Sequence, residues 1–258
     1  MPIHSTAIVD PSARVPDSGN IGPYCIIGPD VELGENCHLV SHVHIEGPTR
    51  IGSNVRVFPF TSLGMAPQDI GYAGEPTRLE IGGNNEIREF VTINRGTVKG
   101  GGITRIGSHV LIMAYTHVAH DCQIGDHVIL ANAATLGGHV MVEEWAVVGA
   151  LCPVHQFVRI GAHSYIGGGT TVTRDVLPFS KTAAARDTHA YGINSVGLER
   201  RGFTPDRIRK IHHAYKVLLA SKLNTSQALE KLKSEPDGGD DVAMLVQFIE
   251  TSERGVIK

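Results

Sequence analysis

Residues 106–130 read IGSHVLIMAYTHVAHDCQIGDHVIL, and every sixth position of this stretch holds an aliphatic residue. The positions are Ile106, Ile112, Val118, Ile124 and Leu130. An amphipathic helix repeats near every 3.6 residues and a half-buried strand alternates at every second residue, so neither explains a period of six. The stretch therefore predicts a fold assembled from six-residue units.

The same period extends over most of the chain in three blocks. The position two residues before each aliphatic residue is usually small or apolar, and glycine often follows it. Two inward residues per unit, with glycine available at corners, describe short strands joined by tight bends. An antiparallel sandwich would not keep a fixed count of six across its loops. Besides the five above, the aliphatic positions are Val9, Val15, Ile21, Ile27, Leu33, Leu39, Ile45, Ile51, Val57, Leu63, Ile81, Ile87, Ile93, Leu136, Val142, Val148, Val154, Ile160, Ile166 and Val172.

Two interruptions break the period, at residues 64–80 and 94–105. They must leave the repeat as loops, and loops that project from a rigid scaffold are common places for binding and catalytic residues. Their composition alone fits a tolerated surface insertion equally well.

The repeat stops after Val172, and a helical pattern replaces it. Thr204-Pro-Asp signals a helix start, and further helical segments are expected from Thr225 and from Asp241. The chain is thus expected to hold a mainly β repeat domain over residues 1–188 and a small C-terminal α-helical domain over residues 189–258.

Composition and charge exclude several classes of protein. The net charge of −3 favours neither nucleic acid nor an anionic membrane as a partner. No stretch approaches the ~20 apolar residues that span a bilayer, and the N-terminus lacks the pattern of a secretory signal. We expect a cytoplasmic protein with no stable membrane insertion. The four cysteines all fall two residues before an aliphatic position, which predicts small core residues and not disulfides or zinc ligands: Cys25, Cys37, Cys122 and Cys152.

Histidines gather around one part of the repeat. Residues 114–121 read AYTHVAHD and place His117, His120 and Asp121 close together, while His139 and His155 each lie within one residue of a step of 18 or 36 from His120. Imidazole titrates near neutral pH and suits general base catalysis, and a neighbouring carboxylate can orient it. Solvated surface histidines aligned by chance, or a metal site, are the alternatives.

The hexads of the form aliphatic-Gly-x-x-x-x resemble the hexapeptide-repeat transferase family. That resemblance implies a left-handed parallel β-helix of hexapeptide repeats, with three hexads in each coil. Longer segments resemble the branch of this family that acylates UDP-N-acetylglucosamine in lipid A biosynthesis. They are QDIGYAGEPTRLEIG (68–82), EFVTINRGTVKGGGITRIGS (89–108), THVAHDCQIGD (116–126), ATLGGHV (134–140), VHQFVRIGAHS (154–164) and GLERRGF (197–203).

The resemblance implies roles for particular residues. His120 would be the general base with Asp121 beside it, and the backbone N–H of Gly138 would stabilise the oxyanion. Gly168 matches the position that limits acyl chain length, and glycine there implies a long chain. The remaining residues would bind the sugar, the nucleotide or the donor's phosphopantetheine arm: Asp69, His117, His139, His155, Gln156, Asn194, Arg200 and Arg201.

The implied activity is transfer of a (3-hydroxy)fatty acyl group from acyl carrier protein to the 3-position of the UDP-amino sugar. The resemblance further implies a homotrimer with sites between subunits and no cofactor or metal. A trimeric zinc-dependent γ-type carbonic anhydrase is a rival, although its closely spaced histidines are not three apart as His117 and His120 are. A purely structural hexapeptide module is another. The glucosamine N-acyltransferase of the same pathway carries an N-terminal domain that this sequence lacks.

Two features bear on the substrates. Residues 196–216 carry six basic residues against Glu199 and Asp206, which could attract an acidic carrier protein. Three positions depart from the family pattern: Gly71 and Asn94 replace a lysine and a histidine, and Val196 replaces an acidic residue. Loss of a cation near the acceptor would suit a 3-amino analogue of the sugar, unless Arg78 or Arg95 compensates.

Overall fold

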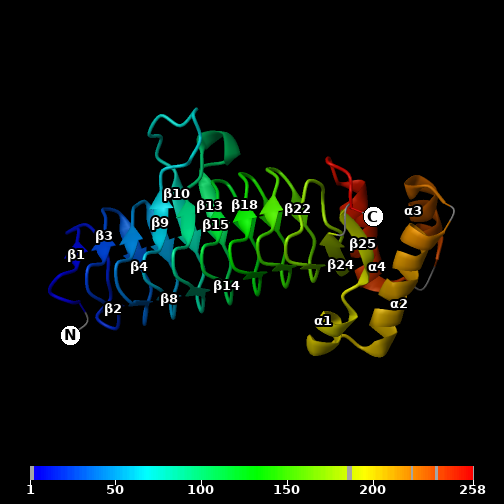
Figure 1. Ribbon diagram of the computed structural model, residues 1–258, viewed down its shortest axis with the longest axis horizontal. Helices are drawn as coiled ribbons and strands as arrows, with labels where there is room; N and C mark the ends of the chain where they lie inside the picture. The colour runs from blue at the N-terminus through cyan, green and yellow to red at the C-terminus, as the bar shows by residue number, and fades with distance from the viewer. Residues whose placement is uncertain (1–2, 185–187, 222, 236–237, 258) are drawn as a thin grey trace.

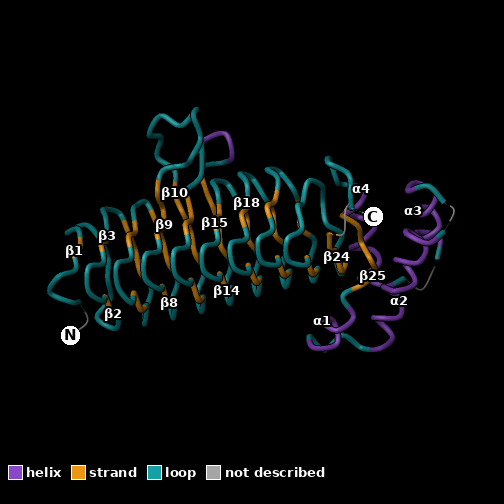
Figure 2. Tube along the Cα trace, viewed as in Figure 1, coloured by secondary structure: helices purple, strands orange, loops and turns teal. Residues whose placement is uncertain are grey.

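Residues 3–184, 188–221, 223–235 and 238–257 are described by the computed structural model, and most of them wind into a left-handed parallel β-helix. Three parallel sheets form the sides of a prism, and each coil passes through every sheet once (Figure 1). Figure 2 shows short strands alternating with turns along the β-helix, one short helical turn in the projecting loops and the other helices at the C-terminal end. The six-residue units predicted from the period and the left-handed parallel β-helix implied by the family resemblance are both confirmed.

The strands of the three sheets are short. Sheet 1 consists of β1 (Ile8–Val9), β3 (Ile26–Ile27), β6 (His44–Ile45), β9 (Ser62–Met65), β12 (Thr92–Asn94), β15 (His117–Val118), β18 (Thr135–Leu136) and β21 (Pro153–Val154). Sheet 2 consists of β4 (Val31–Leu33), β7 (Thr49–Ile51), β10 (Arg78–Ile81), β13 (Ile103–Ile106), β16 (Gln123–Ile124), β19 (Met141–Val142) and β22 (Arg159–Ile160). Sheet 3 consists of β2 (Asn20–Ile21), β5 (His38–Leu39), β8 (Arg56–Val57), β11 (Glu86–Ile87), β14 (Leu111–Ile112), β17 (Ile129–Leu130), β20 (Val147–Val148), β23 (Tyr165–Ile166), β24 (Ser180–Ala184) and β25 (Thr188–Ile193).

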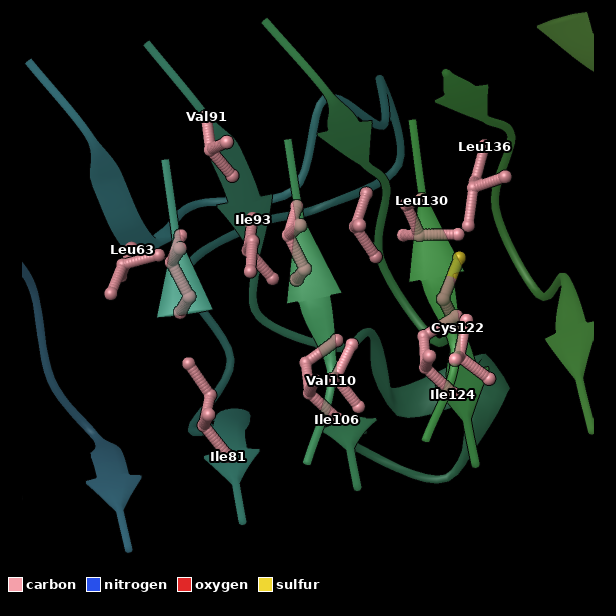
Figure 3. Packing of buried hydrophobic residues seen from close by; sticks show 14 of the residues in the cluster. Leu63, Ile81, Val91, Ile93, Ile106, Val110, Cys122, Ile124, Leu130 and Leu136 are labelled. Atoms are coloured by element: carbon pink, nitrogen blue, oxygen red, sulfur yellow. The ribbon is translucent and has the colours of Figure 1, made fainter. Parts of the chain in front are cut away.

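The aliphatic residues of the repeat fill the interior of the prism. Val118 pairs with Leu136 in the next coil of sheet 1, and Leu130 pairs with Val148 in sheet 3. These side chains are almost fully buried, and residues of successive coils pack in columns (Figure 3). Burial of apolar surface on this scale is the main favourable term in folding. The four cysteines are buried and free, as predicted.

Most strands end at a corner where one residue adopts a left-handed backbone conformation. Asp121 and His139 have φ of 62° at corner 1, which follows sheet 1, and Trp145 has φ of 61° at corner 2, which follows sheet 2. Such values are uncommon for residues other than glycine, so each bend has a steric cost that the surrounding packing must offset. Corner 3 follows sheet 3 and stacks the rings of Tyr24, His42, Phe60, Phe90 and Tyr115 at centroid distances of 4.8 to 5.0 Å.

Both predicted loops leave the prism at corner 1. Loop 1 connects β9 to β10 and loop 2 connects β12 to β13, with a 3-10 turn at Val98–Gly100 in loop 2. The two loops project together from one edge of the β-helix (Figure 1). The register resumes after each one, because Ile93 pairs with Leu63 before it and Val118 after it.

A small helical domain closes the C-terminal end. It contains α1 (Ser195–Arg200), α2 (Pro205–Tyr215), a π-helical turn (Lys216–Ala220), α3 (Thr225–Ser234) and α4 (Gly239–Glu250). Thr204 caps α2 as predicted, because its side chain accepts a hydrogen bond from the N–H of Arg207. The boundary expected at residue 188 falls inside sheet 3, since β25 pairs antiparallel with β24 and extends the sheet to Ile193. Helix α1 was not predicted.

We predict that the interior residues of the repeat determine stability and the loop residues do not. Ile112 is fully buried, so Ile112→Ala should lower the free energy of unfolding by about 2–5 kcal/mol. Ile70 in loop 1 is fully exposed, so the same change there should cost less than about 0.5 kcal/mol. Urea unfolding followed by circular dichroism measures both, and equal costs would contradict this account of the core.

Candidate active site

Corner 1 collects most of the candidate residues because the repeat returns to it every coil. After loops 1 and 2, the next turns of the corner present His120 and Asp121 and then Gly138 and His139. The ring of His139 stacks on that of Phe157 in the following coil, with centroids 4.3 Å apart and planes 6° from parallel. Corner 1 is therefore a column of polar and aromatic side chains under the two loops.

A histidine–carboxylate pair lies at the centre of this column. Nδ1 of His120 is 2.7 Å from Oδ2 of Asp121, whose side chain is only 1% exposed, whereas that of His120 is 16% exposed. A hydrogen bond between Nδ1–H and the carboxylate fixes the tautomer and leaves Nε2 free to accept a proton. The pair has the arrangement of a general base and its orienting carboxylate.

Loop 2 holds the carboxylate of Asp121 in place. The backbone N–H of Thr97 donates to Oδ1 at 2.8 Å, and the Thr97 hydroxyl donates to Oδ2 at 2.6 Å. The N–H of Asp121 in turn donates to the hydroxyl of Thr104 at 2.8 Å. A side chain at Gly100 would overlap the carboxylate, so the loop backbone closes directly over it. Asp121 is thus fully satisfied and cannot rotate freely.

Two further histidines flank the pair. Nε2 of His139 is 3.6 Å from Oδ2 of Asp121, and its ring lies perpendicular to that of His120 at 5.2 Å. The ring of His117 shares a hydrogen bond of 2.7 Å with the hydroxyl of Thr92. Burial lowers the pKa of both His117 and His139. Both rings therefore favour the neutral form at neutral pH.

Gly138 borders the free nitrogen of His120. A Cβ atom at residue 138 would lie 2.6 Å from Cε1 and 2.8 Å from Nε2 of His120, so any larger residue would cover the base. The N–H of Gly138 has no acceptor among the described residues. It therefore remains available for a ligand oxygen.

Asp69 reaches this region from loop 1. Its Oδ1 accepts a hydrogen bond of 3.0 Å from the N–H of Gly71, and its charge acts to raise the pKa of His139 against the larger effect of burial. A cavity of about 580 Å³ continues along the corner from His139 and Phe157 to Arg254 near the C-terminus. The structure brings together Asp69, His117, His120, Asp121, Gly138 and His139.

Other predicted residues lie elsewhere. The side-chain N–H of Asn194 donates to the carbonyl of His163 at 3.1 Å, and the guanidinium of Arg201 lies 5.4 Å from the centre of the Trp145 ring, so both residues are at corner 2. Arg200 is exposed in α1, beside Arg201. Arg201 is partly buried, burial lowers its pKa, and its Nη1 has no partner among the described residues.

The remaining predicted residues also lie apart from the pair. His155 is exposed, and its Nδ1 is 3.0 Å from the carbonyl of Gln156 and 3.3 Å from Nη1 of Arg254. The structure thus does not join His155 to His120, although both are at corner 1. Gln156 is exposed two coils beyond His120, and Gly168 is exposed at corner 3 beside Ala150.

A metal site is not needed to explain the cluster. Ligand atoms of His120, Asp121 and His139 lie within 4.8 Å of one another, but His117 is outside this group. Both oxygens of Asp121 already accept hydrogen bonds, and its Oδ2 faces His120 and His139. Hydrogen bonding therefore accounts for the arrangement.

A β-helix of hexapeptide repeats with a histidine–carboxylate pair under two loops has the architecture of a hexapeptide-repeat transferase. A family model described as bacterial transferase hexapeptide matches residues 103–138, and one described as UDP N-acetylglucosamine O-acyltransferase, domain 2, matches residues 175–257. None of the described helices is both long enough and apolar enough to cross a bilayer.

Relatives match over nearly the whole chain. Proteins from Thermodesulfovibrio yellowstonii and Herminiimonas arsenicoxydans, each named acyl-(acyl-carrier-protein)–UDP-N-acetylglucosamine O-acyltransferase, are 50% and 49% identical to it, with 99% of each chain covered. The solved structure of LpxA from Acinetobacter baumannii is 44% identical, with a TM-score of 0.96 and 100% of both chains covered. The chain belongs to the family of UDP-N-acetylglucosamine O-acyltransferases.

Several residues of the site were missed by the sequence analysis. Thr97 is part of the RGT segment that carries the resemblance, but loop 2 has no period from which its contact with Asp121 could be predicted. Thr104 and Gly100 were missed for the same reason. Thr97 and Gly100 within the irregular loop, and Thr104 at the start of the strand that follows it, were the available signal.

We predict that Thr97 acts as a positioning residue through Asp121. Thr97→Val keeps the shape and the backbone N–H but removes the hydroxyl, and should lower kcat about tenfold, a part of the ~10²- to 10⁴-fold that a general base supplies. KM should change little and Thr97→Ser should restore kcat. Steady-state kinetics with Thr135→Val, at an exposed threonine of β18, provide the matched control. An unchanged kcat for Thr97→Val would show that this hydroxyl does not support the base.

Proposed function

We propose that this chain transfers a fatty acyl group from acyl carrier protein to the 3-hydroxyl of UDP-N-acetylglucosamine, the first step of lipid A biosynthesis. The observation that carries the proposal is the buried and fully satisfied Asp121 that orients His120 beside the unoccupied N–H of Gly138. The activity is the one for which the relatives are named. Acyl carrier protein and UDP-sugars meet in the cytoplasm, so we place the protein there.

The reaction follows from these groups. Nε2 of His120 removes the proton of the sugar hydroxyl as its oxygen attacks the thioester carbonyl, since an alcohol is otherwise a weak nucleophile. The negative charge that develops on the carbonyl oxygen is stabilised by the N–H of Gly138. Collapse of the tetrahedral intermediate expels the carrier thiolate, which takes the proton from His120. Asp121 stabilises the imidazolium between these steps.

One contact of residue 71 weighs against the alternative acceptor, the 3-amino sugar. That hypothesis assumed the loss of a cation at Gly71, but a Cβ atom there would lie 3.3 Å from Nζ of Lys99. Asn94 is buried and bonds the carbonyl of Ala66, so it braces loop 1. The ammonium of Lys99 would repel a protonated 3-amino group, and we therefore propose the hydroxyl acceptor.

Neither arginine considered as compensation is available. Arg95 donates to the hydroxyl of Tyr72 at 3.1 Å and to the carbonyl of Gly64 at 2.8 Å. Arg78 forms an ion pair of 2.8 Å with Glu80.

The basic segment 196–216, which could attract the acyl carrier protein, offers less free positive charge than its sequence suggested. Arg207 forms a bidentate pair with Asp241, and Arg209 and Lys210 both pair with Asp206. Arg200 and Arg201 remain the groups proposed to meet phosphates. Gly168 stays the proposed limit of the acyl pocket, because a glycine leaves room there, and the family resemblance implies a chain of about C12 to C14.

We further propose a homotrimer with each site shared by two subunits. His120 and Asp121 occupy corner 1, whereas Asn194 and Arg201 occupy corner 2, so one subunit cannot direct both sets at one substrate. A neighbouring subunit related by rotation can bring its corner 2 to this corner 1. A catalytic pocket would then form between the two prisms.

The test of the activity is an acyl-transfer assay with acyl carrier protein and paired 3-hydroxy and 3-amino acceptors. We predict that the hydroxyl acceptor has the higher kcat/KM and that His120→Ala lowers turnover about 10²- to 10⁴-fold. His38→Ala, in β5 of sheet 3, is the control. Transfer that survives His120→Ala would remove His120 as the base, and preference for the amine would reverse the acceptor assignment.

The shared site predicts complementation between two inactive variants. His120→Ala and Arg201→Ala subunits, assembled together in equal amounts, should recover about a quarter of the wild-type sites, because each site draws the two residues from different chains. Light scattering should show a trimer for each preparation. A mixture as inactive as its components would place both residues in the same subunit's site.

A further inference from the structure

We propose that Lys99 of loop 2 is an acceptor-binding residue that holds the sugar ring jointly with Asp69 of loop 1. The inference rests on the proposed function, because it names the group that positions the acceptor for His120. Sequence analysis assigned Lys99 no role, since nothing in its spacing connects it to residue 69.

The ammonium and the carboxylate approach the same point from two different loops. A Cβ atom at Gly71 would lie 3.3 Å from Nζ of Lys99, and 3.6 Å and 3.7 Å from the two carboxylate oxygens of Asp69. Gly71 does not require glycine for its backbone, because its φ is outside the left-handed region. The missing side chain at residue 71 leaves the space that the Lys99 ammonium borders.

Lys99 is fixed relative to the catalytic pair by its neighbours in sequence. Thr97 binds the carboxylate of Asp121 and also caps the turn Val98–Gly100, where its side chain accepts a hydrogen bond from the N–H of Gly100. The backbone of Gly100 packs against the same carboxylate. Lys99 lies between these two anchors, so its position is coupled to that of the base.

The ammonium of Lys99 has no ion-pair partner among the described residues. Within the part of the chain that the structure describes, no carboxylate lies within the 4.0 Å of an ion pair with its Nζ, and the side chain is exposed. Arg78 and Arg95, by contrast, are both bonded to protein groups, as described above. Lys99 is thus a cation at the edge of the site with its donors available.

A donor and an acceptor side by side suit a sugar better than a phosphate. Each hydroxyl of a sugar ring both donates and accepts, so neighbouring hydroxyls can accept from an ammonium and donate to a carboxylate. A phosphate has no proton to donate at neutral pH and would be repelled by Asp69. The pair Lys99–Asp69 is therefore matched to the N-acetylglucosamine ring.

The experiment compares Lys99→Gln, Gly71→Lys and the double variant in the acyl-transfer assay. Lys99→Gln should raise the KM for UDP-N-acetylglucosamine about tenfold or more, as expected for a lost charged hydrogen bond, without changing the KM for the donor. Gly71→Lys alone should also weaken acceptor binding, because two ammonium groups would compete for one space. The double variant returns one cation to that space and should recover most of the loss. Lys231→Gln, at an exposed lysine of α3, is the control.

The outcomes separate the inference from the proposed function. If wild-type protein transfers acyl groups but Lys99→Gln keeps an acceptor KM within twofold of wild type, Lys99 does not bind the acceptor. If the acceptor KM of the double variant is no lower than that of Lys99→Gln, a lysine at residue 71 does not replace Lys99, and the inference is equally overturned. Absence of transfer by the wild-type protein would instead overturn the proposed function itself.

Discussion

The strict register between successive coils is the constraint on which the rest of this structure depends. Each coil must supply inward aliphatic side chains and a left-handed bend at its corners, and hydrogen bonds between coils keep equivalent residues 18 apart in line. Side chains at equivalent positions are then forced to stack. The aromatic column of corner 3 and the sequence Asp121, His139, Phe157 at corner 1 are both products of this constraint.

The site forms where the register is interrupted and then resumed. Loops 1 and 2 leave corner 1 in two successive coils, and the next coils return to the same corner with His120 and Gly138. The loops add what a straight column cannot provide, namely groups that approach from outside the prism. Thr97 closes over Asp121 in this way, and burial of the carboxylate follows from it. A rigid scaffold therefore fixes the base, and irregular backbone completes its surroundings.

The period of six was sufficient to predict short strands joined by tight bends, the two loops and the buried cysteines, because each depends only on the repeat, whereas the left-handed parallel winding came from the family resemblance. The period was less reliable for predicting which single residues meet at the site. His139 lies one position past the step of 18 from His120, and the structure accordingly places it beside Asp121. His155 falls one position short of the next step and turns toward Arg254 instead. Contacts made by Thr97 and Lys99 could not be predicted, because the loops carry no period.

The shape of a solenoid supports the proposal that each site is shared between subunits. A prism has convex corners, whereas small-molecule sites are concave and enclose most of their ligand. The loops provide one wall at corner 1, but Asn194 and Arg201 are held at corner 2 by contacts with His163 and Trp145. These contacts belong to the docking of the helical domain on the end of the β-helix, so they cannot shift toward corner 1 without undocking that domain. In the proposed homotrimer, a neighbouring subunit brings its corner 2 groups to face His120, so the shape of the fold supports the proposal of a site shared between subunits.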